Sequence, residues 1–190
     1  MKYLLVIALL ISLVACNQQQ RNKYKGESLS TADSIQQKKE LDSAQLGSAD
    51  QNFVKSIALS GMLEVAAGKM AGEKSKDTAI QNFGRILVKH HQQLAKDLKD
   101  VVSQRDIQFP EKLDDSHQQK MDSLAAIPTA EFDRAFLQLM IQDHKTAVSL
   151  FDQIGAHGKD VQLQAFANKN IPIIRKHLKL ANDLIEKGQP

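Results

Sequence analysis

The stretch TAEFDRAFLQLMIQDHKTAVSLFDQIG, residues 129–155, decides the fold class of this chain. Large apolar residues recur in it every three or four positions, which is the period of an amphipathic α-helix. Pro128 favours a helix start just before the stretch, and the segment from Gly155 to Gly158 ends it. The pattern therefore predicts a long helix with one buried face, formed by Phe132, Phe136, Leu139, Leu150 and Ile154.

Three more segments have the same period, at about residues 49–73, 77–105 and 159–187. The first opens with Ser48-Ala49-Asp50-Gln51, which fits a capping box with Ser48 at the cap. A longer break after the second segment begins near Phe109-Pro110 and predicts a short helix near 116–125. Long helices joined mostly by short connections pack as a bundle. We expect an all-α, antiparallel four-helix bundle over residues 48–190, with a short extra helix between helices 2 and 3.

Composition and motifs exclude several classes of protein. The chain has 25 Lys and Arg against 22 Asp and Glu and no Trp, so neither charge nor aromatic content predicts nucleic-acid binding. The sequence contains no glycine-rich phosphate loop and no serine nucleophile elbow. An enzymatic role stays open, and a non-enzymatic one is favoured.

The N-terminus is typical of a secreted, lipid-anchored protein. After Lys2, residues 3–15 are apolar except for Ser12, a run too short to span a bilayer. Leu13-Val14-Ala15-Cys16 resembles the lipobox of bacterial lipoproteins, and Cys16 is the chain's one cysteine. We therefore predict a signal peptide over 1–15 and lipidation of Cys16. The alternative is an ordinary signal peptide with a chance cysteine.

Residues 16–47 are polar, rich in Gln, Lys, Ser and Asn, and are predicted to form a flexible tether between Cys16 and the bundle. The lipid on Cys16 makes the membrane the first expected partner. Asn17, where an Asp would favour inner-membrane retention in well-studied lipoproteins, is compatible with the outer membrane. The predicted location is the bacterial cell envelope, on the outer membrane facing the periplasm.

Each of the four long segments carries a polar residue in the middle of its apolar stripe. These residues are Glu64, His91, Asp143 with His144 on its flank, and His177. In an antiparallel bundle, mid-helix positions meet at one height, so we expect a buried polar layer. Two interpretations stay open: a carboxylate–imidazole network that sets helix register, or a metal site for Zn or Fe.

The histidine spacing argues against a di-iron centre, which uses a Glu three residues before a His on two helices. Val88 and Ile174 occupy those positions here. His90 is expected to be partly exposed, because adjacent helical residues point about 100° apart. Two further residues are assigned structural roles: Asp133 on the flank of His144, and Pro172 as a tolerated kink.

Four motifs together carry a family resemblance. They are Phe53 with Gly61-Met62-Leu63-Glu64-Val65, Phe83 with Leu87-Val88-Lys89-His90-His91, Phe132-Asp133 with Met140-Ile141-Gln142-Asp143-His144, and Ile171-Pro172 with His177-Leu178. In order and spacing they resemble the bacterial envelope family catalogued as domain of unknown function 4142. The resemblance implies a ferritin-like four-helix fold from about Asp50 to Leu184 and an envelope setting, without an established activity. His90 stands where that family usually has an acidic residue.

The sequence thus predicts a membrane-tethered helical bundle with a buried Glu/His layer of structural or metal-binding use. The first alternative is a metal-dependent enzyme or a metal-storage protein. The second is a scaffold that binds a protein partner in the envelope.

Overall fold

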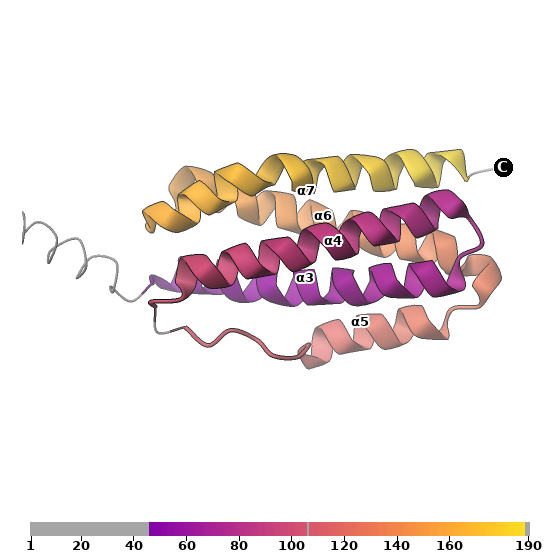
Figure 1. The fold of residues 1–190 in the computed structure, drawn as a ribbon, viewed down its shortest axis with the longest axis horizontal. Coiled ribbons are helices and arrows are strands. Elements are labelled where there is room, and N and C mark those ends of the chain that lie inside the picture. Colours follow the sequence, from indigo (N-terminus) through magenta and orange to yellow (C-terminus); the bar gives the residue numbers. More distant parts are fainter. Residues whose placement is uncertain (1–45, 106, 189–190) are drawn as a thin grey trace, which may run out of the picture. The chain divides into compact units, whose positions relative to one another are not determined.

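A computed structural model of the chain describes residues 46–105 and 107–188 (Figure 1). The predicted signal peptide, Cys16 and all but the end of the tether lie outside the described residues. The described chain folds into helices α3 (Ser48–Lys74), α4 (Thr78–Val102), α5 (Asp115–Ala126), α6 (Thr129–His157) and α7 (Val161–Lys187), with no strand among them. The predicted all-α class is therefore confirmed. None of these helices has an apolar stretch long enough to cross a bilayer.

Aspartate side chains cap the N-termini of three helices. Asp77 accepts a hydrogen bond from the backbone of Ala79 at the start of α4, and Asp114 and Asp160 act likewise for α5 and α7. Each side chain satisfies an amide of the first turn that has no partner within the helix. Pro128 precedes α6, as the sequence predicted.

The capping box predicted for the first helix is wrong. The N-cap residue is Gly47, which has no side chain that could cap the helix. Ser48 is therefore the first residue inside α3 and not its cap. Gln51 Nε2 instead donates to the carbonyl of Leu46, 2.7 Å away. The Gln51 side chain thus binds a backbone carbonyl before the helix and not the backbone N–H of Ser48, as a capping box would require. The second long helix also ends earlier than predicted, at Val102 instead of residue 105.

The four long helices form two packed pairs. Helix α3 packs along α4, α6 packs along α7, and the pairs meet through α3 with α6 and α4 with α7. The described residues between α4 and α6, 103–105 and 107–128, return along the length of the bundle, with α5 packed on α3 (Figure 1). This single long crossover makes every neighbouring pair antiparallel and is the connection found in ferritin-like bundles.

The buried core consists of two apolar clusters. One contains the T-shaped pair Phe53 and Phe151, whose ring centres are 5.2 Å apart, and the other contains Phe83, Phe132 and Phe136. Along every long helix the first cluster lies on one side of a mid-helix polar residue and the second lies on the other, except that Leu63 of the second cluster directly precedes Glu64. The polar residues therefore form a layer between two hydrophobic halves.

Candidate metal centre

The layer contains one inward-pointing polar residue from each long helix: Glu64 of α3, His91 of α4, His144 of α6 and His177 of α7. All four are at most 3% exposed. Their positions follow from the sequence, because each falls on the apolar stripe of an amphipathic helix near its midpoint. The structure thus brings together four residues that lie far apart in the chain.

Glu64 lies on the outer side of the histidines and binds the first of them. Its Oε2 accepts a hydrogen bond from His91 Nδ1 at 2.8 Å. His144 Nδ1 lies 3.2 Å from Glu64 Oε1 but donates to the carbonyl of Met140, 2.9 Å away. Glu64 Oε1 accordingly accepts no hydrogen bond. The Nδ1 protons of His91 and His144 are thereby directed to oxygen atoms, and the Nε2 atom of each ring is left as an acceptor.

Those two Nε2 atoms face one nitrogen of the third histidine. His177 Nδ1 lies 3.3 Å from His91 Nε2 and 3.2 Å from His144 Nε2. Nitrogens bound to a tetrahedral zinc ion at its usual bond length lie about 3.4 Å apart. Among the described residues, these three histidines form a buried group whose ligand atoms all lie within 4.8 Å of one another. The triad could therefore hold a metal ion.

His90 completes the arrangement from outside the layer. Its Nδ1 lies 2.8 Å from His177 Nε2, and the two rings are stacked with an interplanar angle of 9°. His90 is partly exposed, as expected, yet it binds the outer nitrogen of His177. Sequence reasoning missed this role because His90 and His91 diverge on α4. The packing of α4 against α7 places α7 on the side of α4 that carries His90, and the sequence alone does not show this.

Burial and charge set the protonation of the layer. Burial lowers the pKa of His177 to about 3, and His91, His144 and His90 add to the shift. Burial alone would raise the pKa of Glu64, but His91 and His144 outweigh it and lower that pKa to about 2. At neutral pH the layer thus combines an ionised carboxylate with a neutral His177.

The proton shared by His90 and His177 gives the layer two arrangements. If His90 Nδ1 carries it, His177 Nδ1–H donates toward His91 and His144, and the layer is a closed hydrogen-bond network. If His177 Nε2–H donates to His90, His177 Nδ1 becomes a third inward lone pair. Metal-bound histidines in proteins donate their outer N–H to an oxygen or nitrogen acceptor in this way. The same residues can therefore form a structural network or a three-nitrogen metal site.

The structure does not bring the other predicted site residues into the layer. Asp143 is buried, but its Oδ2 accepts from Ser60 Oγ at 2.6 Å and its Oδ1 pairs with Lys120 of α5 at 3.1 Å. Asp143 thus ties the crossover helix to the bundle, while the next residue, His144, points inward. Asp133 is half-buried, and its Oδ1 has no hydrogen-bond partner among the described residues. Pro172 is exposed, and α7 continues through it.

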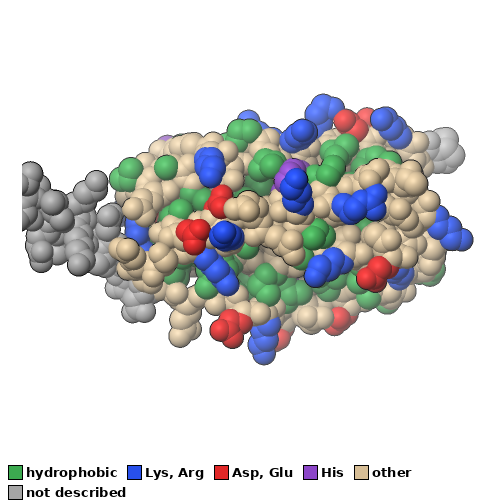
Figure 2. Space-filling model, in the orientation of Figure 1, with side chains coloured by type: hydrophobic (Ala, Val, Ile, Leu, Met, Phe, Trp, Pro, Cys, Tyr) green, Lys and Arg blue, Asp and Glu red, His purple; other side chains and the backbone are tan. Residues whose placement is uncertain are grey.

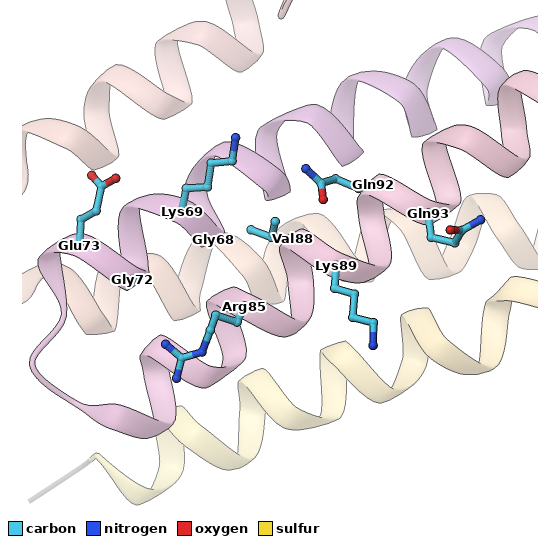
Figure 3. Close-up of a pocket in the computed structure, with 9 residues that line it drawn as sticks. All are labelled: Gly68, Lys69, Gly72, Glu73, Arg85, Val88, Lys89, Gln92 and Gln93. Carbon is cyan, nitrogen blue, oxygen red and sulfur yellow. The ribbon is translucent and has the colours of Figure 1, made fainter.

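One hollow of the described surface lies away from the histidines. A groove of about 630 Å³ lies on the outer side of α3 and α4. Lys69, Glu73, Arg85 and Lys89 line it but point in different directions (Figure 3). Over the face seen in Figure 2, acidic and basic side chains are likewise interspersed. Val161 is the one large hydrophobic residue exposed in the described part of the chain.

Comparisons with known proteins agree with this fold. A crystal structure described as a DUF305 fragment from Deinococcus radiodurans is similar with a TM-score of 0.65 and 13% sequence identity, covering 76% of this chain and 99% of that one. At such identity the likeness shows the fold alone. A search of curated proteins gives no match. The model of one protein family, however, matches residues 36–184, as the sequence motifs predicted. The chain belongs to the family described as "Domain of unknown function (DUF4142)".

Proposed function

We propose that this protein is an envelope lipoprotein whose helical bundle binds one divalent transition-metal ion through His91, His144 and His177. The observation that carries the proposal is the orientation of the three rings. Their inner nitrogens face one another at 3.2 and 3.3 Å, and each outer nitrogen has its own hydrogen-bond partner. In the arrangement where His177 Nε2–H donates to His90, three lone pairs point inward, and they repel one another unless a cation lies between them.

The donor set favours zinc or another imidazole-binding ion over a di-iron pair. Three neutral imidazoles suit Zn²⁺, Cu²⁺, Fe²⁺ or Ni²⁺, whereas di-iron bundles use four carboxylates. The two nitrogen–nitrogen separations of 3.2 and 3.3 Å are close to those around a tetrahedral zinc ion, which favours zinc within that group. Ionised Glu64 supplies a compensating negative charge without contacting the inner nitrogens. When bound, such an ion supplies Lewis acidity, which keeps open both a storage role and a metal-dependent enzyme.

Metal content tests the proposal directly. The full chain, purified in detergent without chelators or a metal-binding tag, is expected to hold about one equivalent of metal after incubation with zinc. His91→Ala and His177→Ala should each lose it. His157→Ala is the matched control, because His157 is exposed at the end of α6 and should retain the metal. Absence of metal from the wild-type chain, or equal binding by all variants, would contradict the proposal.

The second candidate function is a purely structural layer. One specific observation favours it: with the proton on His90 Nδ1, hydrogen bonds link His90, His177, His91 and Glu64 across three helices. Such a network would hold α3, α4 and α7 in register without an ion. Metal-free protein whose stability does not rise when zinc is added would support this function.

The envelope location rests on the N-terminal sequence. Lipidation of Cys16 by several acyl chains would hold the protein stably at a membrane. Cys16→Ser is therefore expected to release the protein from the membrane fraction and to abolish incorporation of labelled fatty acid, with Ser12→Ala as the control. A Cys16→Ser protein that still partitions with membranes would refute the anchor. The scaffold alternative, a protein partner in the envelope, stays a prediction.

A further inference from the structure

The histidine triad leaves one corner of a tetrahedron without a protein ligand. With metal–nitrogen bonds of about 2.05 Å, His177 Nδ1 and the Nε2 atom of His91 or His144, 3.3 and 3.2 Å away, subtend close to the tetrahedral angle. Three protein ligands fill three of the four positions of a tetrahedral ion, which leaves the fourth position open. Structural zinc sites close all four positions with protein atoms, whereas reactive sites keep one for an exogenous ligand.

The nearby carboxylates are held away from that corner. Glu64 contacts the outer Nδ1 atoms of His91 and His144, on the far side of both rings from the inner nitrogens. Asp143 is engaged by Ser60 and Lys120. Among the described residues, only the three histidines form a group of side chains that could ligate an ion at this point.

A cavity touches two of the three triad histidines. It measures about 90 Å³ and lies between α4 and α7, and its lining combines exposed Gln93 and half-buried Asp97 with buried His91 and His177. Since a water molecule occupies about 30 Å³, the cavity has room for a few waters or one small ion. It is too small for an organic substrate of several rings.

The net charge of the metal site indicates which kind of ligand would fill the open coordination position. A divalent ion bound by three uncharged imidazoles carries two positive charges, and Glu64 is the one carboxylate in contact with the triad, so at least one positive charge stays uncompensated in the buried layer. A buried net charge is unfavourable, and a monoanion would neutralise it. The carboxylate in the cavity lining does not repel such an ion strongly, because Asp97 is itself paired with Lys169 at 3.3 Å.

We propose that the metal of this site takes its fourth ligand, a water molecule or a small monoanion, through the cavity between α4 and α7. This inference rests on the proposed metal function. It makes the centre an open, three-histidine site instead of a closed structural one.

Cobalt(II) substitution tests the inference, because the visible spectrum of Co²⁺ reports its coordination. The full chain in detergent is first titrated with Co²⁺ and then with azide. We expect one Co²⁺ to bind with the intense bands of a four-coordinate ion. Azide should then change those bands in a saturable manner, with one azide per ion. A cobalt spectrum that stays unchanged at high azide concentration would overturn the inference and leave the metal function standing.

If the proposed metal binding itself is wrong, the cobalt titration gives a different result. In that case Co²⁺ either does not bind or gives the same spectrum with His91→Ala, and azide is irrelevant. The two outcomes are therefore distinguishable in one titration.

A larger side chain in the cavity tests whether the anion binds there. Ile173→Phe places a ring in the cavity and is expected to weaken azide binding at least tenfold while Co²⁺ still binds. Leu139→Phe adds the same ring in the groove between α5 and α6, away from the cavity, and serves as the matched control. Equal azide affinity in the two variants would overturn the route through α4 and α7.

Discussion

At the scale of single residues, the chemistry of the layer depends on hydrogen bonds to the outer nitrogens of its histidines. His91 has a carboxylate there, His144 has a backbone carbonyl, and His177 has the ring of His90. Partners of this kind orient a ligating imidazole and determine which nitrogen carries its proton. His90 is the variable member, because it is the one partner that can itself give or accept the proton.

A substitution that separates the hydrogen bond of His90 from its stacking tests this role. His90→Phe retains a flat ring against His177 but removes the acceptor, so we expect zinc affinity to fall by about 10–100-fold. His90→Asp restores an acceptor near the position of Nδ1 and should recover most of the affinity. Calorimetric titration with zinc gives both values, with the melting temperature of each metal-free variant as the control for folding. Equal affinity in wild type and His90→Phe would show that His90 does not support the site.

At the scale of secondary-structure elements, glycines determine how closely α3 and α4 approach. A Cβ atom added to Gly84 would lie 2.5 Å from the carbonyl oxygen of Gly68, and one added to Gly68 would lie 2.7 Å from the carbonyl of Gly84. Both obstacles are backbone atoms, which cannot rotate away. This contact lies in the second hydrophobic half, about one turn from Glu64 along α3 and about two turns from His91 along α4. It therefore helps to hold the Glu64 carboxylate within reach of His91.

Two glycine substitutions in this helix pair should act in opposite directions. Gly84→Ala is expected to destabilise the bundle by about 1–3 kcal/mol, because the methyl group forces α3 and α4 apart. Gly72→Ala meets nothing within 4 Å on the exposed side of α3 and should stabilise by up to about 1 kcal/mol through helix propensity. Urea unfolding followed by circular dichroism measures both. Destabilisation of similar size in both variants would contradict the close approach at Gly84.

At the scale of the whole bundle, the polar layer separates two hydrophobic halves and joins all four long helices. A change in the protonation of this layer therefore changes the free energy of unfolding of the whole bundle, and not the stability of one helix alone. The low pKa values of His177 and Glu64 act in the same direction. In both cases the unfolded chain binds a proton that the folded chain excludes, so stability decreases as the pH falls.

The metal-free protein should consequently lose stability on acidification in two overlapping ranges. His177 contributes between its ordinary pKa of 6.5 and its folded pKa of about 3, and Glu64 contributes between 4.5 and about 2. Each group changes the free energy of unfolding by at most about 1.4 kcal/mol per pH unit. His177→Asn, which cannot titrate, should flatten the dependence between pH 6.5 and 4.5. Chemical unfolding in EDTA at a series of pH values measures this, and an unchanged slope in the variant would contradict the assignment.

The sequence by itself determined the helices and the height of the layer. The period of apolar residues predicted α3, α4, α6 and α7 to within a few residues, because that period is a local property of the chain. It also placed Glu64, His91 and His177 on the apolar stripes, since a mid-stripe position is buried in almost any antiparallel packing. The end of α4 and the cap of α3 were missed because helix ends depend on local hydrogen bonds that several residues compete to make.

Only the tertiary structure decided which neighbouring side chains face the centre. Asp143 and His144 are adjacent on α6, about 100° apart, and the rotation of α6 against α3 and α7 directs His144 inward and Asp143 toward Ser60 and Lys120. In the same way, the approach of α7 to α4 brings His90 to His177 and leaves the cavity beside them. Helix rotation and interhelical distance are set by the packing of the whole core, and a single chain's periodicity does not contain them.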